Sequence, residues 1–181
     1  MDIRPTPTAP LLRWGAITVP LVLLLGFASG MSAPAGRDNA WYMALSRPAQ
    51  TPPDWAFPVA WTTIYVLLGI AIAIVLATRP ARGRGLATGL FMLGFALSLA
   101  WMPLFFGAHL VSAAVWLIAA MVVVGIATTF AFARVRRVAA WLMVPYLVWI
   151  SFAGVLTWSI DRMNPMAETL VPPAATSQIE G

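Results

Sequence analysis

The amino-acid sequence predicts an all-α integral membrane protein, a bundle of five transmembrane helices. Of its 181 residues, 61% are hydrophobic and only 9% are charged. A soluble globular domain carries about 25% charged residues, because its surface must be covered with groups that water solvates. In this chain the charged residues fall between long apolar runs. Both observations indicate that the apolar surface faces lipid.

Five segments are long enough to cross a bilayer, since about 20 apolar residues in a helix span roughly 30 Å of hydrocarbon. They lack the two-residue alternation of a membrane β-barrel, which favours helices. We expect one membrane domain over residues 1–166, with a long loop at 34–54 and a disordered tail at 167–181. The expected helices cover residues 11–33, 55–77, 86–106, 110–132 and 138–160.

The first segment has a second interpretation as a cleaved signal peptide. Arg4 and Arg13 precede its apolar run, and Ala28-Ser29-Gly30 resembles a cleavage site. Removal of this segment would leave four helices. Its length is sufficient to span a membrane, so we favour a retained helix.

Arginines are distributed unequally between the two sides of the predicted bundle. The chain has no lysine, and eight of its eleven arginines fall on the side of the N-terminus. Positive residues are retained in the cytoplasm, so we expect the N-terminus inside and the C-terminus outside, which favours a bacterial inner membrane. Because the arginines flank apolar segments, nucleic-acid binding is excluded. The three arginines on the other side are Arg37, Arg47 and Arg162.

The loop at 34–54 contains apolar residues that a solvated linker would not need, among them Trp41, Tyr42 and Leu45. Long loops in compact domains are often functional. We therefore expect this loop to fold over the outer end of the bundle as a lid.

Residues that carry catalysis or bind metals are scarce. The chain has no cysteine and one histidine, His109, which we place in a turn. No set of residues has metal-ligand spacing, so no metal, catalytic residue or obligatory cofactor is expected. Asp54 precedes the second span and is predicted to cap its N-terminus.

Aromatic residues are abundant, with nine Trp, nine Phe and three Tyr. Interfacial belts account for some of the tryptophans, whereas deeper ones either pack between helices or line a pocket for a flat apolar ligand. Small residues at four-residue spacing, Gly94 and Ser98, predict either a homodimer seam or close packing within one chain.

Four motifs occur in order between residues 41 and 164. They are Trp41-Tyr42-x-x-Leu45-x-Arg47-Pro48 continued by Pro52-Pro53-x-Trp55, Trp101-x-Pro103-Leu104-Phe105-Phe106-Gly107, Val144-Pro145-Tyr146-Leu147-x-Trp149, and Met163-Asn164. Together they resemble the TspO family, also known as translocator proteins or tryptophan-rich sensory proteins.

The resemblance implies a five-helix bundle, often dimeric, with a pocket under the first loop. Members bind porphyrins and other tetrapyrroles, sterols, and benzodiazepine-type drugs, and some bacterial members are placed in the outer membrane. Arg47 is either a partner for a porphyrin propionate or an ordinary surface arginine, and the dimer seam would contain Gly94 and Ser98. By position, the pocket or its lid would include Trp41, Tyr42, Arg47, Pro52, Trp61, Ser98, Trp101, Tyr146, Trp149 and Thr157.

Several positions depart from the family pattern. Ala49 and Gln50 replace two aromatic residues of the loop, and Ser98 and Thr157 stand where asparagines are expected. Fewer aromatic and amide anchors disfavour light-dependent porphyrin degradation. A sterol motif is also imperfect, because Leu156, Trp158 and Arg162 place a tryptophan where the pattern requires tyrosine.

The leading hypothesis is a membrane protein that binds a tetrapyrrole, such as a porphyrin or haem, or another planar or sterol-like ligand. Its role would be sensory, regulatory or in ligand transport. One alternative is an assembly or structural subunit of a larger membrane complex, such as a photosynthetic one. A second alternative is a porphyrin-degrading enzyme.

Overall fold

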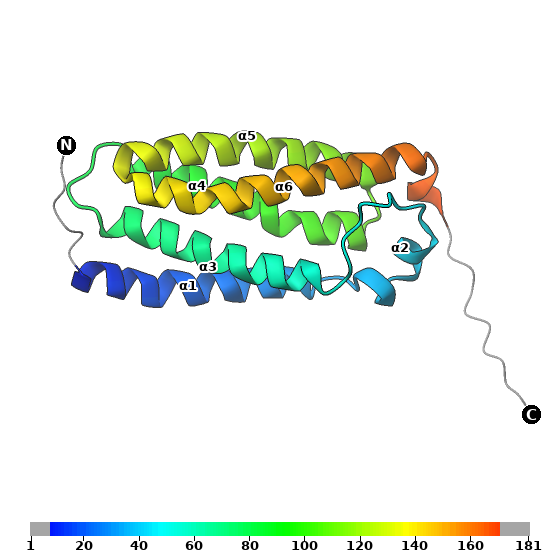
Figure 1. Cartoon of the computed structure of the whole chain (residues 1–181), viewed down its shortest axis with the longest axis horizontal. Coiled ribbons are helices and arrows are strands. Elements are labelled where there is room, and N and C mark those ends of the chain that lie inside the picture. The colour runs from blue at the N-terminus through cyan, green and yellow to red at the C-terminus, as the bar shows by residue number, and fades with distance from the viewer. Residues whose placement is uncertain (1–7, 171–181) are drawn as a thin grey trace, which may run out of the picture.

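The computed structural model describes residues 8–170 and confirms the predicted helical membrane fold. Five helices in this range are long and apolar enough to cross a membrane, and they run side by side along the long axis of the molecule (Figure 1). No β-strand occurs among residues 8–170. The long helices are α1 (Thr8–Gly30), α3 (Ala56–Ala77), α4 (Arg84–Met102), α5 (Val111–Val135) and α6 (Arg137–Met163).

Each long helix lies within a few residues of its expected range. α4 ends at Met102 because Pro103 begins a π-helical turn, η2 (Pro103–Gly107), which carries the chain to α5. Two short elements shape the loop between α1 and α3: the 3-10 turn η1 (Gly36–Asp38) and the helix α2 (Ala40–Ala44).

Residues 167–169, which were expected to belong to a disordered tail, form regular structure. Ala167–Thr169 form the 3-10 turn η3, and the Ala167 side chain is buried. The turn is held in place because the carbonyl oxygen of Ala167 accepts a hydrogen bond from the Trp41 side chain of the loop. The rest of the expected tail, residues 171–181, lies outside the described residues.

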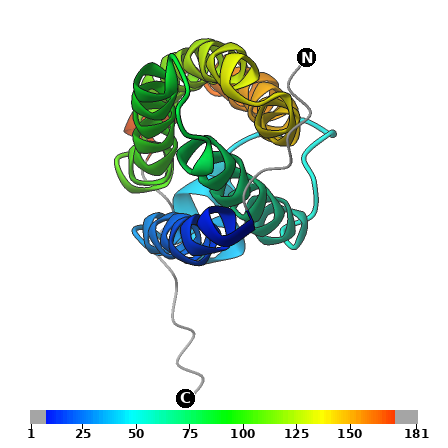
Figure 2. The same cartoon turned by 90° about the vertical axis from the view of Figure 1, so that its left-hand side faces the viewer.

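The helices pack in a ring. Neighbouring pairs are α1 with α3, α3 with α6, α6 with α5, α5 with α4, and α4 with α1. Seen from the end, α4, α5 and α6 form an arc that α1 and α3 close (Figure 2). The core between them is rich in aromatic and large aliphatic side chains, including Tyr65, Phe91, Phe95, Met121 and Phe132.

The two ends of the bundle differ. One end holds the start of α1, the α3–α4 loop and the α5–α6 turn (Figure 1). We call it the arginine end, since Arg13, Arg79, Arg82 and Arg134 are among the residues there. The opposite end, the loop end, holds residues 31–55, η2 and η3 (Figure 1).

Helix α1 approaches α3 closely at two glycines. A Cβ atom at Gly69 would lie 2.7 Å from Cα of Val19, and one at Gly26 would overlap the ring of Tyr65. The Thr18 hydroxyl donates a hydrogen bond of 2.7 Å to the carbonyl oxygen of Gly69. Small residues at membrane-helix contacts permit such close backbone approach. These two glycines therefore allow α1 to pack tightly against α3.

We predict that Gly69→Ala destabilises the protein although alanine is the better helix former. The added methyl group meets the backbone of Val19, and overpacking of this kind costs about 1–3 kcal/mol. Gly15→Ala, at a helical glycine with open space around it, is the matched control and is expected to be neutral or stabilising. Thermal unfolding in detergent measures both, and equal midpoints would contradict the close α1–α3 contact.

Candidate functional site

The centre of the loop end is the side chain of Trp41 in α2, which is only 2% exposed. Its ring stacks on His109 with centroids 4.2 Å apart, and it meets Phe105 edge to face at 5.5 Å. Its Nε1–H donates a hydrogen bond of 2.8 Å to the carbonyl oxygen of Ala167. One indole therefore joins the loop, the turn before α5 and the segment after α6.

Tyr42 extends this aromatic cluster. Its ring lies edge-on to Phe106 at 5.2 Å and to Phe105 at 6.3 Å. The guanidinium of Arg47 lies over the Tyr42 ring, 5.0 Å from its centroid. A cation over an aromatic face is attracted by the ring quadrupole, so Tyr42 restrains the head group of Arg47.

Asn39 fixes the start of α2. Its Oδ1 accepts a hydrogen bond of 2.9 Å from the backbone N–H of Tyr42, the usual bond of an N-terminal cap. Its Nδ2 donates to the carbonyl oxygens of Pro34, at 2.9 Å, and Phe106, at 3.2 Å. The same side chain thus attaches the loop to η2.

Asn164, just after α6, holds the other part of the loop. Its Oδ1 accepts a hydrogen bond of 2.9 Å from the backbone N–H of Ser46. Its Nδ2 donates to the carbonyl oxygen of Ser46 at 2.8 Å. The amide therefore pairs with both backbone groups of one residue, as a neighbouring strand would.

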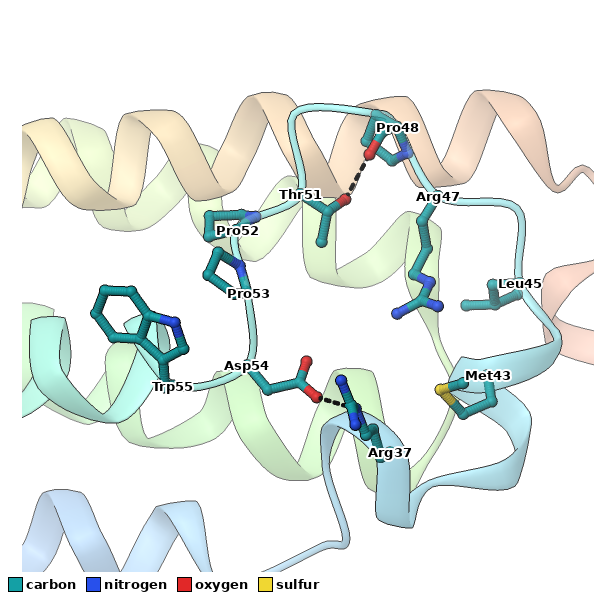
Figure 3. Close-up of a pocket in the computed structure, with 10 residues that line it drawn as sticks. All are labelled: Arg37, Met43, Leu45, Arg47, Pro48, Thr51, Pro52, Pro53, Asp54 and Trp55. Carbon is teal, nitrogen blue, oxygen red and sulfur yellow. Dashed lines mark hydrogen bonds and ion pairs between the residues drawn. The ribbon is translucent and has the colours of Figure 1, made fainter.

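These attachments leave a hollow of about 1030 Å³ framed by the loop. Figure 3 shows the rim and the side chain of Arg47, which points into the opening. The rim combines apolar side chains and prolines with charged groups. Its residues are Arg37, Met43, Leu45, Arg47, Pro48, Thr51, Pro52, Pro53, Asp54 and Trp55.

Asp54 does not cap α3, contrary to the expectation from the sequence. The N-cap of α3 is Trp55, and no side chain bonds to the helix start. The Asp54 carboxylate instead pairs with Arg37, whose Nε lies 3.1 Å from Oδ2 (Figure 3). This pair joins the two ends of the loop at the edge of the hollow (Figure 3). Its side chains are exposed, so the pair contributes little stability.

Ser98 and Tyr146 lie elsewhere, in the packed interior of the bundle. Their hydroxyl oxygens are 2.7 Å apart, and a void of about 10 Å³ adjoins them. Gly94 also faces inward, because a Cβ atom there would lie 3.3 Å from Val124 of α5. Gly94 and Ser98 are thus buried inside one protomer. A homodimer seam on α4 would have to use outward-facing residues such as Gly89 and Ala96.

The remaining predicted aromatic residues, Trp61, Trp101 and Trp149, make separate contacts. Phe57 at the start of α3 meets Trp149 of α6 edge to face at 5.8 Å, and Trp61 packs on Tyr65 at 5.2 Å. Trp101 stacks on Phe105 at 5.0 Å, and its buried Nε1–H has no hydrogen-bond partner among the described residues.

Thr157 and the sterol-motif residues do not share one surface. Thr157 is buried and donates to the carbonyl oxygen of Ala153 in its own helix at 2.8 Å. Leu156 is buried, whereas Trp158 is exposed. The guanidinium of Arg162 lies 5.6 Å from the Trp158 ring centroid. The motif is therefore divided between the interior and the outside of α6.

The structure thus gathers five of the ten predicted pocket residues at the loop end: Trp41, Tyr42, Arg47, Pro52 and, packed against the Trp41 cluster, Trp101. Sequence reasoning missed Asn39 as a cap and Asn164 as a loop anchor. An asparagine before α2 is a recognisable cap signal. No local pattern pairs Asn164 with Ser46, which lies 118 residues away. Among residues 8–170, no group of three acidic, histidine or cysteine side chains is placed to hold a metal.

Five membrane-spanning helices closed at one end by an aromatic-rich loop define a polytopic membrane protein with a capped bundle. The model of the TspO/MBR family matches residues 16–163. The chain belongs to this family.

The chain aligns with named relatives over most of its length. It is 36% identical to the tryptophan-rich protein TspO of Chlorobaculum tepidum over 83% of this chain and 95% of that protein. It is 34% identical to protein CrtK of Rhodobacter capsulatus, over 70% of this chain and 80% of CrtK. It is also 32% identical to the translocator protein of Homo sapiens, over 77% and 84% of the two chains.

We predict that Asn164→Ala loosens the loop without unfolding the bundle. The change removes both hydrogen bonds to Ser46. At about 1–1.5 kcal/mol net for such bonds, exchange of the Ser46 amide should become roughly ten-fold faster. Ser159→Ala removes a hydroxyl that bonds only within α6 and is the control. Unchanged exchange at Ser46 would contradict the anchoring role of Asn164.

Proposed function

We propose that this protein binds a tetrapyrrole, or a similarly planar and apolar ligand, in the hollow framed by the loop. The observation that carries the proposal is the hollow itself, whose rim is mostly apolar and includes the guanidinium of Arg47 (Figure 3). Ligand sites are commonly clefts of roughly 300–1,000 Å³ with apolar walls and few polar groups. The volume of about 1030 Å³ is sufficient for a large ring system.

The rim is suited to a rigid ligand. Pro48, Pro52 and Pro53 restrict the backbone, and the bonds of Asn164 and Trp41 hold the loop from below. A preorganised site loses less conformational entropy on binding. A flat ring would therefore gain apolar contact with the prolines and Trp55 at low ordering cost.

Arg47 is the candidate anchor for a carboxylate of the ligand. It is restrained over Tyr42 and pairs with no carboxylate in the described part of the chain. A guanidinium binds a carboxylate with two parallel hydrogen bonds. Arg37, by contrast, already has Asp54 as its partner.

We further propose that binding serves a sensory or regulatory role, or transport of the ligand. Relatives are named tryptophan-rich sensory protein, from Cereibacter sphaeroides, and translocator protein, from Homo sapiens. The arrangement of arginines supports an orientation with the arginine end in the cytoplasm. In that orientation the hollow opens on the opposite side of the membrane, where a ligand from outside can enter.

We predict saturable one-to-one binding of protoporphyrin IX to the detergent-purified protein, measured by tryptophan quenching and the Soret band. Trp41→Ala should weaken it roughly ten-fold or more, because the indole supports the loop from a buried position. Trp116→Ala is the control, since Trp116 is 76% exposed on α5. Absence of saturable binding, or equal losses in both variants, would contradict the proposal.

The same titration under light tests the alternative of an enzyme. Stable absorbance of the bound porphyrin supports a binding protein. Bleaching that depends on the protein and is lost in Trp41→Phe or Trp61→Phe would support porphyrin degradation instead.

We predict that Arg47 distinguishes protoporphyrin IX from its dimethyl ester. The wild-type protein should bind the free acid more tightly, and Arg47→Gln should remove that preference while retaining affinity for the ester. Arg162→Gln changes the formal charge equally at the same end of the bundle and should keep the preference. If Arg47→Gln also keeps it, the carboxylate is bound elsewhere.

A further inference from the structure

The charged residues of the described chain are separated by end. Four acidic residues are described, Asp38, Asp54, Asp161 and Glu168, and all belong to the loop end. The arginine end carries no acidic residue within residues 8–170. Its arginines there are Arg13, Arg79, Arg82, Arg84, Arg134, Arg136 and Arg137.

Most of these arginines are exposed, including Arg82 and Arg137. Arg84 is only partly exposed, and its buried Nη1 has no hydrogen-bond partner in the described part of the protein. A buried donor without an acceptor is unfavourable. The guanidinium groups that oxygens from outside the protein can reach are those of the exposed arginines, Arg13, Arg79, Arg82, Arg134 and Arg137.

The helix starts add to the positive potential. α4 and α6 both begin at this end (Figure 1), and neither has a side-chain cap or an acidic residue in its first turn. The first half of α4 lies beside the end of α5, because Phe91 of α4 stacks on Phe132 of α5 at 5.9 Å, and α6 begins directly after α5. Arg84 precedes Phe91 by about two turns, which places it level with the α5–α6 turn.

Exposed apolar side chains stand directly beside these arginines. Leu12, next to Arg13, is 73% exposed, and Leu86, just after Arg84, is 64% exposed. Val138, next to Arg137, is 62% exposed. Each of these three arginines therefore lies beside an exposed apolar side chain. A positive charge next to an apolar surface suits an amphipathic molecule better than a free anion or an acidic protein.

We propose that the arginine end binds anionic phospholipids, with the phosphates on the guanidinium groups and the acyl chains along the adjacent apolar side chains. This surface is separate from the loop-end hollow, and the proposal does not depend on the ligand proposed there. Clusters of arginine beside a membrane helix attract anionic headgroups of the leaflet. The bound lipids supply acceptors for the exposed guanidinium groups of this end.

The test measures dissociation constants by native mass spectrometry, for the full chain in a neutral detergent titrated with phosphatidylglycerol or phosphatidylcholine. The double variant Arg82→Gln/Arg137→Gln removes two exposed arginines from the arginine end. The control variant Arg37→Gln/Arg162→Gln removes the same charge from the loop end. Phosphatidylglycerol should bind more tightly than phosphatidylcholine, and each arginine removed from the arginine end should weaken it roughly five-fold.

The control variant should retain the wild-type affinity for phosphatidylglycerol. Equal affinities for the two lipids, or equal losses in the two double variants, would overturn the proposal. Replacing chloride by inorganic phosphate at constant ionic strength tests whether the site binds a lipid headgroup or any free phosphate. Unchanged lipid binding supports a phospholipid site, whereas displacement by inorganic phosphate would show a general anion site and overturn the lipid assignment.

Discussion

The loop end depends on one buried side chain, the indole of Trp41. A loop that crosses the end of a helical bundle must find partners for its backbone groups, and it must also bury its apolar residues. Trp41 buries its apolar ring by packing on His109 and Phe105. Through its bond to Ala167 it also orders the segment after α6. With that segment in place, Asn164 can pair with Ser46, and the rest of the loop is left to frame the hollow.

This arrangement separates the molecule into regions with different physical roles. The middle of the bundle is tightly packed, and the void beside Ser98 and Tyr146 has a volume of only about 10 Å³. The loop end combines a mostly apolar, proline-rich rim with a restrained guanidinium (Figure 3). The arginine end concentrates positive charge without described acidic partners. We therefore propose a ligand with a flat apolar body and a carboxylate at the loop end, and anionic lipids at the arginine end.

The five spans could be predicted from the sequence, because length and hydropathy alone decide whether a helix crosses a bilayer. The apolar residues of the loop also indicated that it folds over the bundle, because side chains such as Trp41 and Leu45 are favourable only when buried, and both are buried. Contacts between distant residues could not be predicted. Asp54 follows the local pattern of a helix cap, yet the structure pairs it with Arg37. Spacing on α4 suggested a seam through Gly94 and Ser98, but only the packed structure shows that both face inward.

The central claim is that a tetrapyrrole binds in the loop-framed hollow, and anomalous scattering from a metalloporphyrin would locate the ring directly. Crystals grown with zinc protoporphyrin should show the zinc peak within the rim formed by Arg47, Pro52 and Trp55. A peak between α3 and α6 beside Trp61 and Trp149, or zinc bound only at the protein exterior, would contradict the account.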